Sequence, residues 1–355
     1  MLKGHGGNIR EAAKTANIAP EKILDFSASI NRWVDGGLFE KWSREAVAEV
    51  GNYPDPEYTE LREAVGKCAG VAPESVLVGN GSTELLYLVP RSMKFKKGLV
   101  VSPSYADYAD ALEMADCAVT HFFLNESDDF ALDEKKIDRA VSDGACDVVV
   151  LGNPNNPTGA AFPKEKLLGV VNSNPKTTFL VDESFADFNP ASSLFPDVPE
   201  NVVVIRSLTK YFGIPGIRAG YAVAGPGIVS AVSQKREPWT MNCFAQFFST
   251  RLLNGEMGSV NILARTHAER DFLTKGLLGI NGLRPFPSNA NFLLVAVGVA
   301  GMNSEKLRWI LLNEYGILIR DCSNFKGLDD RFIRIGVRTR YENALLLTAL
   351  RKILG

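Results

Sequence analysis

The chain has 355 residues, of which 46% are hydrophobic and 23% charged, a size and composition that predict a globular protein of two domains. Its 39 basic residues nearly balance 41 acidic ones, which excludes the strong positive field that attracts nucleic acid or a membrane surface. The five scattered cysteines show no metal-ligand spacing and no apolar run is long enough to span a membrane, so we expect a cytoplasmic protein without a metal site.

Short β-branched runs alternate with longer segments of helical period, the pattern of a mainly parallel sheet covered by helices. The segments expected as buried strands are SVLVGNG (75–81), GLVVSPSY (98–105), CDVVVLGNPNNPTG (146–159), TTFLVDESF (177–185), NVVVIRSLTK (201–210) and RAGYAVA (218–224). From about residue 246, a helical stretch and the runs NANFLLVAV, GILIRDC and RFIRIGVR indicate a smaller α+β domain. We therefore expect an α/β protein whose large domain is 45–245, with 1–44 and 246–355 forming an N-terminal arm and a small domain.

Polar residues follow several of these strands, and ligands of open α/β sheets bind beyond the carboxyl ends of the strands. In GNGSTE, Ser82 and Thr83 start a helix, where free backbone N–H groups suit a phosphate; alternatively one hydroxyl caps the helix. Tyr105 could stack on a planar ligand or simply pack half-buried. Asn156 in NPNNPTG either belongs to a rigid turn or directs its amide at a hydroxyl or phenolate.

Two charged residues at strand ends narrow the chemistry. Asp182 closes an apolar strand, where a carboxylate is costly unless a cation meets it. Lys210 is accompanied by Ser207, Thr209 and Arg218, whose two hydroxyls and guanidinium are typical of a phosphate clamp. A desolvated lysine near other cations has a lowered pKa and can form a Schiff base with a carbonyl. Pyridoxal 5′-phosphate carries a phosphate, an aldehyde, a phenolate and a basic ring nitrogen, and so satisfies all these groups.

At this point the chain resembles a known family, the fold-type I pyridoxal-phosphate enzymes of the histidinol-phosphate aminotransferase kind. Eight segments match in the family's order and cover nearly the whole chain: NYPDP, GNGSTE, PSYADY, NPNNPTG, VDESF, SLTKYFGIPGIRAGY, ANFLL and FIRIGVRT. One such segment would be weak evidence, but eight in sequence are highly specific. The resemblance implies the fold-type I architecture, with a mainly parallel large domain and a smaller α+β domain.

The resemblance also assigns roles to the strand-end residues. It implies that Lys210 carries the cofactor and that Asp182 meets the ring nitrogen, which makes these two the candidate catalytic residues. Tyr105 would stack on the ring and Asn156 would bond the ring oxygen. Tyr53 would reach the phosphate of the neighbouring subunit, which implies a homodimer. The residues assigned to the cofactor phosphate are Ser82, Thr83, Ser207, Thr209 and Arg218.

Two subgroups of the family compete, and stretches near the two ends of the chain separate them. HGGNIREAAK (5–14), ILDFSASIN (23–31) and IRDCSNFKGLDDRFIRIGVR (319–338) are similar to the threonine-phosphate decarboxylases of cobalamin synthesis. Phe185 stands where many of the aminotransferases have a tyrosine that bonds the ring oxygen, which also favours a decarboxylase. The loop RWVDGG (32–37) departs from the family pattern, in which a proline is expected after Asn31.

The expected reaction converts L-threonine O-3-phosphate to (R)-1-amino-2-propanol O-2-phosphate and carbon dioxide. This substrate is anionic at both ends, so it requires two cationic pockets. Arg334 matches the family's arginine for the α-carboxylate, and we expect Arg320 to bind the substrate phosphate, with His5 lending a donor. The alternatives are a surface role for Arg320 and a disordered terminus at His5. The further substrate-site candidates are Asn31, Arg338 and Arg340.

Other functions remain open at this stage. One is transamination of histidinol phosphate with 2-oxoglutarate, and another is a non-catalytic binding protein that serves as a sensor or as the effector domain of a regulator. The presence of both Lys210 and Arg334 favours an enzyme. Acceptance of serine phosphate also stays open. A nicotinamide enzyme is excluded, because no GxGxxG follows any expected strand.

Overall fold

The computed structural model of the protein describes residues 6–258 and 261–355, and within them the largest sheet has seven strands in the order β2-β8-β7-β6-β5-β3-β4. Only β8 runs antiparallel to its neighbours within this sheet. All six strands expected from the sequence are present, and β4 is an additional edge strand. The strands are β2 (Val76–Asn80), β3 (Lys97–Ser102), β4 (Ala118–Phe123), β5 (Val148–Gly152), β6 (Thr178–Asp182), β7 (Val202–Ser207) and β8 (Ala219–Ala224).

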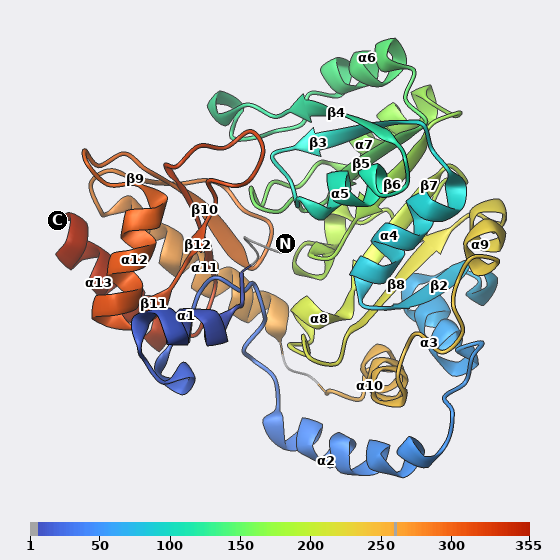
Figure 1. Ribbon diagram of the computed structural model, residues 1–355, viewed down its shortest axis with the longest axis horizontal. Coiled ribbons are helices and arrows are strands. Elements are labelled where there is room, and N and C mark those ends of the chain that lie inside the picture. The colour runs from blue at the N-terminus through green and yellow to red at the C-terminus, as the bar shows by residue number, and fades with distance from the viewer. Residues whose placement is uncertain (1–5, 259–260) are drawn as a thin grey trace.

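Helices cover both faces of this sheet (Figure 1). The strands alternate side chains between the two faces, so in β5 Val148 and Val150 pack in one apolar cluster while Val149 and Leu151 pack in another. The first cluster includes α4 (Ser82–Met93), α5 (Asp107–Glu113) and α9 (Pro226–Ser233), and the second includes α6 (Glu134–Gly144) and α7 (Lys164–Ser173). Because both faces are buried, the central strands are apolar without alternation, as the sequence indicated.

The C-terminal part builds a second, antiparallel sheet in the order β12-β13-β10-β9. Its strands and the helices α11, α12 and α13 share one apolar cluster, which includes Leu273, Leu311 and Leu346. In α13 the Thr339 and Glu342 side chains form a capping box that fixes its first turn. The elements are α11 (Ile262–Leu278), β9 (Leu283–Pro285), β10 (Phe292–Val297), α12 (Ser304–Tyr315), β12 (Arg320–Asp321), β13 (Phe332–Gly336) and α13 (Arg340–Leu354).

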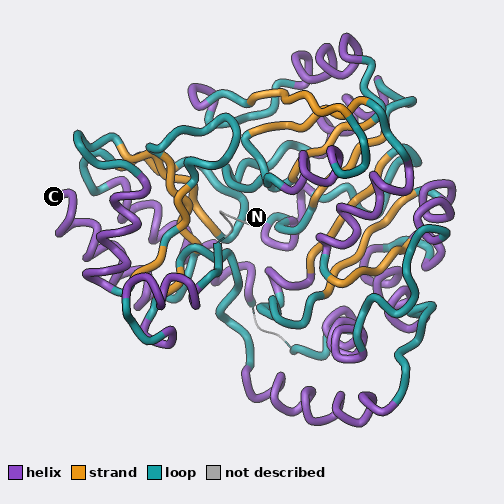
Figure 2. Tube along the Cα trace, viewed as in Figure 1, coloured by secondary structure: helices purple, strands orange, loops and turns teal. Residues whose placement is uncertain are grey.

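The N-terminal segment joins the C-terminal part. After α1 (Ile9–Ala16) and η1 (Pro20–Lys22), β1 (Leu24–Asp25) pairs in parallel with β11 (Ile317–Leu318). Figure 2 shows how the chain then passes along the bottom of the molecule in α2 (Gly36–Ala46) to reach the large sheet. Asp35, in the loop 32–37, accepts hydrogen bonds from the amides of Gly37 and Leu38 and so caps α2. The last residues of this loop therefore form the start of α2.

One helix lies across the domain boundary expected near residue 246. Residues of α10 (Cys243–Leu253) pack with α3 (Thr59–Ala69) and with α2, where the rings of Phe248 and Trp42 meet edge to face at 5.6 Å. The domain bounds 45–245 and 246–355 stay a prediction. The remaining short helices are η2 (Val47–Gly51), η3 (Pro73–Ser75), η4 (Glu126–Asp128), η5 (Ala186–Phe188), η6 (Pro190–Ser192) and α8 (Leu208–Tyr211). No helix within the described residues has the length and apolar character needed to cross a membrane.

Candidate active site

Lys210 lies just beyond the end of β7, in the single helical turn α8. Its Nζ donates to Thr209 Oγ1 at 3.0 Å, and Thr209 Oγ1 in turn lies 2.8 Å from Ser207 Oγ. Burial lowers the pKa of Lys210 to about 8; Asp182 opposes this shift, while Arg218 and Arg334 add to it. The amine is therefore partly unprotonated near neutral pH, the state that a nucleophile needs.

Asp182 ends β6, the neighbour of β7 in the sheet. Its Oδ2 accepts a 2.7 Å hydrogen bond from the Tyr108 hydroxyl, and its Oδ1 accepts one of 2.9 Å from the amide of Ser184. Burial raises the pKa of Tyr108, so this phenol stays a neutral donor. A Cβ at residue 152 would lie only 3.0 Å from the Tyr108 hydroxyl, so Gly152 leaves room for this contact.

Tyr108 is a site residue that the sequence analysis did not identify. Asp182 was expected to need a cationic partner, and the donors that the described residues supply to it by hydrogen bond are both neutral. The negative charge of Asp182 is thus oriented without being neutralised by a bonded cation. A carboxylate held in this way suits a basic ring nitrogen, which it would keep protonated.

The start of α4 lies against β8, and two glycines permit this approach. A Cβ at residue 220 would lie 2.4 Å from the backbone nitrogen of Ser82, and one at residue 81 would lie 2.5 Å from Arg218 Nη2. Because β8 runs antiparallel to β7, Arg218 just before β8 reaches the sheet edge at which β7 ends. Gly81 is the N-cap of α4 and no side chain caps the helix, so the alternative that Ser82 or Thr83 caps it is wrong.

Two neighbouring asparagines after β5 have different surroundings. The amide nitrogen of Asn155 donates to Pro103 O at 2.8 Å and to Thr158 Oγ1 at 2.9 Å, so Asn155 holds the loop together. Asn156 Oδ1 accepts instead from Arg334 Nη1. Tyr105, half-buried beyond the end of β3, meets the ring of Tyr108 edge to face at 5.7 Å.

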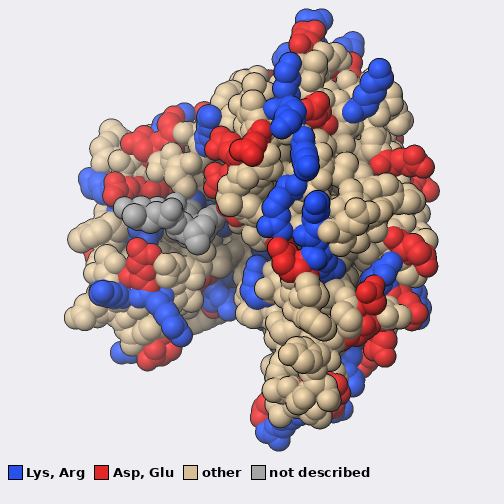
Figure 3. Space-filling model, turned by 45° about the vertical axis from the view of Figure 1, so that its right-hand side comes forward, with Lys and Arg blue, Asp and Glu red and all other residues tan. Residues whose placement is uncertain are grey.

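Arg320 and Arg334 are register partners on the antiparallel strands β12 and β13. Paired residues project from the same face of a sheet, so the two guanidinium groups lie on the same side of it. Arg334 Nη2 donates to Ser27 O at 2.8 Å, and burial lowers the pKa of Arg334 to about 10. Burial also lowers the pKa of Arg320. The space-filling view shows basic side chains in the hollow between the small and the large sheet regions (Figure 3).

The other arginine candidates have acidic partners. Arg338 pairs with Glu342 and also donates to Asp25 O, and Arg340 pairs with Glu269. These ion pairs account for both residues as parts of the small-domain structure.

The N-terminal segment brings residues to the same place. The backbone amide of Asn31 donates to Lys210 O at 3.0 Å, and its side-chain nitrogen donates to Tyr211 O at 2.6 Å. Asn31 therefore fastens this segment to the turn that carries the lysine. Gly7 donates to Ser27 Oγ at 2.8 Å, which places the chain beside the Arg334 contact. His5 lies outside the described residues.

Among the predicted site residues that the structure describes, Tyr53 lies apart from the others within a single chain. It is 84% exposed, and its ring lies 5.1 Å from that of Trp239.

The model of the family "Aminotransferase class I and II" matches residues 23–353 of the chain. The chain belongs to this family. The predicted fold-type I architecture and the cofactor of this family, pyridoxal phosphate, are thereby confirmed.

Three curated relatives match the sequence of this family member over most of its length. It is 32% identical over 357 residues to the threonine-phosphate decarboxylase of Salmonella typhimurium, covering 99% of this chain and 96% of that protein. It is 34% identical over 361 residues to the adenosylcobalamin biosynthesis bifunctional protein CobDQ of Leptospira interrogans, covering 99% of this chain but only 41% of that longer protein. It is 30% identical over 349 residues to the L-serine phosphate decarboxylase of Sulfurospirillum multivorans, covering 95% and 86%.

Two solved structures of the same family carry different activities in their names. The histidinol-phosphate aminotransferase of Clostridium acetobutylicum superposes with a TM-score of 0.84 at 31% identity, covering 93% of this chain and 99% of that one. The L-threonine-O-3-phosphate decarboxylase of Porphyromonas gingivalis superposes with a TM-score of 0.83 at 29% identity, covering 93% and 98%. The choice between these activities depends on the residues around the substrate.

The residues of this family member fit its cofactor. The glycine-lined start of α4 with Arg218 offers a cradle that a Cβ would fill, as a phosphate requires. Asp182 would present an oriented carboxylate to the ring nitrogen, and Lys210 would offer an amine with a lowered pKa to the aldehyde. Ser207 and Thr209 supply hydroxyls next to that amine.

Proposed function

We propose that the protein decarboxylates L-threonine O-3-phosphate to (R)-1-amino-2-propanol O-2-phosphate, for cobalamin biosynthesis. The observation that carries the proposal is the pair of buried arginines, Arg320 and Arg334, in register on β12 and β13. A substrate with a carboxylate and a phosphate supplies two anions to two guanidinium groups. Histidinol phosphate has the phosphate but no carboxylate.

The roles of the residues follow from their positions. Arg334, bonded to Asn156 and to Ser27 O, would grip the α-carboxylate, and Arg320 would bind the phosphate. Pyridoxal phosphate, held by Lys210, Asp182 and Arg218, would supply an electron sink for the bond that is broken at Cα. Asp182 would hold the proton of the ring nitrogen in place. The Lys210 amine, with its pKa near 8, is suited to hold a proton and to return it at Cα.

Phe185 supports decarboxylation over transamination. It is buried and meets Phe292 edge to face at 5.0 Å, and Arg334 lies over the same Phe292 ring at 5.1 Å. Phe185 therefore packs against the ring that lies beneath Arg334 and offers no hydroxyl to the ring oxygen, for which Asn156 would be a donor. Transamination of histidinol phosphate is the second candidate, favoured by the Clostridium structure.

We also propose a cytoplasmic homodimer. Val47, Val50, Tyr53 and Trp239 are 60%, 60%, 84% and 46% exposed, and the rings of Tyr53 and Trp239 lie together; an exposed apolar patch marks a surface for contact with another protein. If a second copy of the chain covered these residues, Tyr53 of one subunit would lie near the cofactor-phosphate site of the other. A non-catalytic binding role is disfavoured by the presence of Arg334 beside Lys210, because its buried guanidinium offers a site for a substrate anion in addition to the cofactor.

The experiment that tests the function is an assay of the purified protein with threonine phosphate, in which carbon dioxide and keto-acid formation are measured side by side. Carbon dioxide without keto acid is the expected result. Turnover of histidinol phosphate that depends on 2-oxoglutarate, with no carbon dioxide from threonine phosphate, would establish the aminotransferase instead. Serine phosphate in a parallel assay shows whether the methyl group of threonine phosphate is required.

A further inference from the structure

The two arginines of the substrate pocket keep their positive charges. Arg334 donates to Asn156 Oδ1 and to a backbone carbonyl, and Arg320 donates to the backbone carbonyl of Asp321 and to Asn324 Oδ1. All of these acceptors are neutral, and across residues 6–258 and 261–355 neither arginine forms an ion pair. A buried charge without a counter-ion is costly, so these guanidinium groups are arranged for an anionic ligand.

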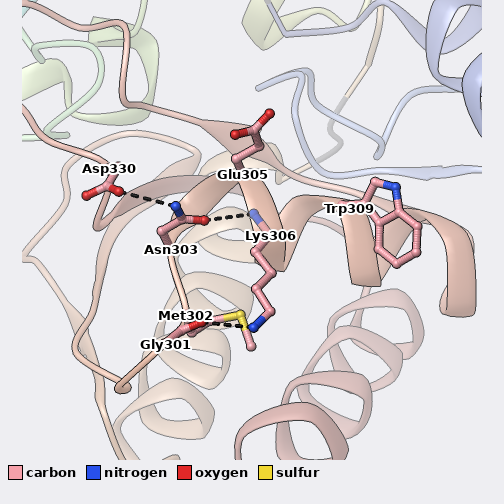
Figure 4. A pocket seen from close by; sticks show the side chains of 7 residues that line it. All are labelled: Gly301, Met302, Asn303, Glu305, Lys306, Trp309 and Asp330. Atoms are coloured by element: carbon pink, nitrogen blue, oxygen red, sulfur yellow. Dashed lines mark hydrogen bonds between the residues drawn. The ribbon is translucent and has the colours of Figure 1, made fainter.

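The acid nearest to Arg320 in sequence is held elsewhere. Asp321 Oδ1 accepts from Ser304 Oγ at 2.7 Å and from the amide of Ser323 at 2.9 Å. Ser304 is the first residue of α12, whose positive end favours a carboxylate. Figure 4 shows this helix end, where Asn303 accepts from the amide of Lys306 and also donates to Asp330. Ser304 and Ser323 thus keep the Asp321 carboxylate bonded to hydroxyl and amide groups.

Asn324 is the side chain that orients Arg320. Its Oδ1 accepts from Arg320 Nη2 at 2.7 Å, and the next residue, Phe325, places its ring 5.0 Å from the guanidinium carbon. An amide oxygen fixes the direction of a guanidinium but leaves its charge available to a ligand, whereas a carboxylate of the same shape would neutralise that charge.

We propose that Asn324 is a positioning residue that sets the preference for a phosphorylated substrate, by holding Arg320 through a neutral oxygen. The proposal rests on the proposed function, because it assumes that Arg320 receives the substrate phosphate. The isosteric change Asn324→Asp places a competing anion on Arg320. The change Asn324→Ala removes the orienting bond without adding charge.

The test compares Asn324→Asp and Asn324→Ala with wild type and with the control Asn281→Asp, which makes the same substitution at an exposed position between α11 and β9. For threonine phosphate we expect the KM to rise at least about tenfold in Asn324→Asp and less in Asn324→Ala, with kcat nearly unchanged. For threonine, which has no phosphate, the KM of the two Asn324 variants should equal that of wild type. Asn324 is exposed, so neither change should unfold the protein.

The outcomes separate this inference from the proposed function. If wild type turns over histidinol phosphate and not threonine phosphate, the proposed function is wrong, and the KM ratios are then measured on histidinol phosphate. On whichever phosphate is turned over, a KM for Asn324→Asp within about twofold of Asn281→Asp overturns the role of Asn324. Equal losses on threonine and on its phosphate would also overturn it, because a structural defect does not discriminate between them.

Discussion

The hydroxyl of Tyr108, on α5, donates a 2.7 Å hydrogen bond to Oδ2 of Asp182, at the end of β6. The orientation of the carboxylate proposed to meet the cofactor is therefore set by a buried phenol from a different element. A hydrogen bond to a charged group contributes about 1.5–3 kcal/mol.

Tyr108→Phe removes this bond while keeping the ring. We expect turnover to fall by about tenfold, since each 1.4 kcal/mol of lost transition-state stabilisation is a factor of ten.

Asp182→Ala should lower turnover by orders of magnitude with the fold retained, because the ring nitrogen then has no carboxylate to keep it protonated. Steady-state kinetics and circular dichroism of both variants measure these effects. Full activity in Asp182→Ala would mean that another group protonates the ring.

Lys210→Ala should abolish borohydride-reducible attachment of the cofactor and nearly all turnover. In the wild-type apoprotein, cofactor attachment should become faster as the pH rises toward about 8 and level off above it, because the lowered pKa of Lys210 makes the unprotonated amine predominant there. An unperturbed lysine would instead gain rate up to about pH 10.4. Arg334 helps to lower this pKa, so Arg334→Ala should move the midpoint to higher pH. Stopped-flow absorbance across this range measures the rate, and a midpoint that stays near pH 10 contradicts the assignment.

Arg320→Ala and Arg334→Ala should each weaken threonine phosphate severely. Removing one partner of a buried, charge-assisted pair costs about 2–5 kcal/mol, which corresponds to a loss of at least about thirtyfold in affinity. Titration of the substrate-induced change in cofactor absorbance gives the affinity directly. Arg340→Ala is the matched control, because its guanidinium already pairs with Glu269. A loss of the same size in that control would show that any arginine removed from the small domain damages the pocket.

Gly6→Ala tests whether the close contact of the N-terminal segment with Ser27 matters for substrate binding. A Cβ at this position would lie 2.2 Å from Ser27 O and 3.4 Å from Arg334 Nη2, so the segment would have to move away from Ser27. We expect a raised KM for threonine phosphate with unchanged cofactor binding. Gly169→Ala, in α7, provides the control, since a Cβ there meets nothing within 4 Å. Identical KM values for the two variants would show that the segment does not approach the substrate.

Tyr53 allows a test of the homodimer that does not depend on mass measurement. Lys210→Ala and Tyr53→Ala remove groups that would belong to the same site but to different subunits. When the two inactive proteins are co-refolded, the mixed dimers should contain one intact site, and up to about one quarter of wild-type activity should return. If the mixture stays as inactive as its components, Tyr53 serves its own subunit or no site.

The sequence predicted the fold well where the signal was local. The strands β5, β6 and β7 each contain an uninterrupted apolar run (VVVL, FLV and VVVI), and β6 and β7 end in the polar residues Asp182 and Ser207 that their segments suggested. The edge strand β4 was missed because its exposure alternates along AVTHFF, so it lacks a run such as VVVLG. An edge strand need not be buried on both faces, so its sequence does not have to be continuously apolar.

The site was harder to predict where contacts are remote. Tyr108 lies three residues after Tyr105, and nothing in PSYADY shows that its hydroxyl reaches a strand end 74 residues away. The facing of Arg320 and Arg334 likewise depends on the register of β12 on β13 across the connecting loop. The side chain of Asn31, which stays a predicted substrate contact, donates to Tyr211 O and accepts from the amide of Trp33, and the first of these partners is likewise remote in the sequence.

The parallel pairing of β1 with β11 also bears on how the protein is made. Translation delivers the segment with Ser27 and Asn31 early, and β11, the strand that pairs with β1, late in the chain. Until Ile317 and Leu318 leave the ribosome, β1 has no neighbour, and Gly336, whose amide donates to Phe26 O, comes later still. Such long-range closure is intrinsically slow. The nascent chain can thus complete its large central sheet before the final strands are made, and a chain released early would carry Lys210 without Arg320 and Arg334.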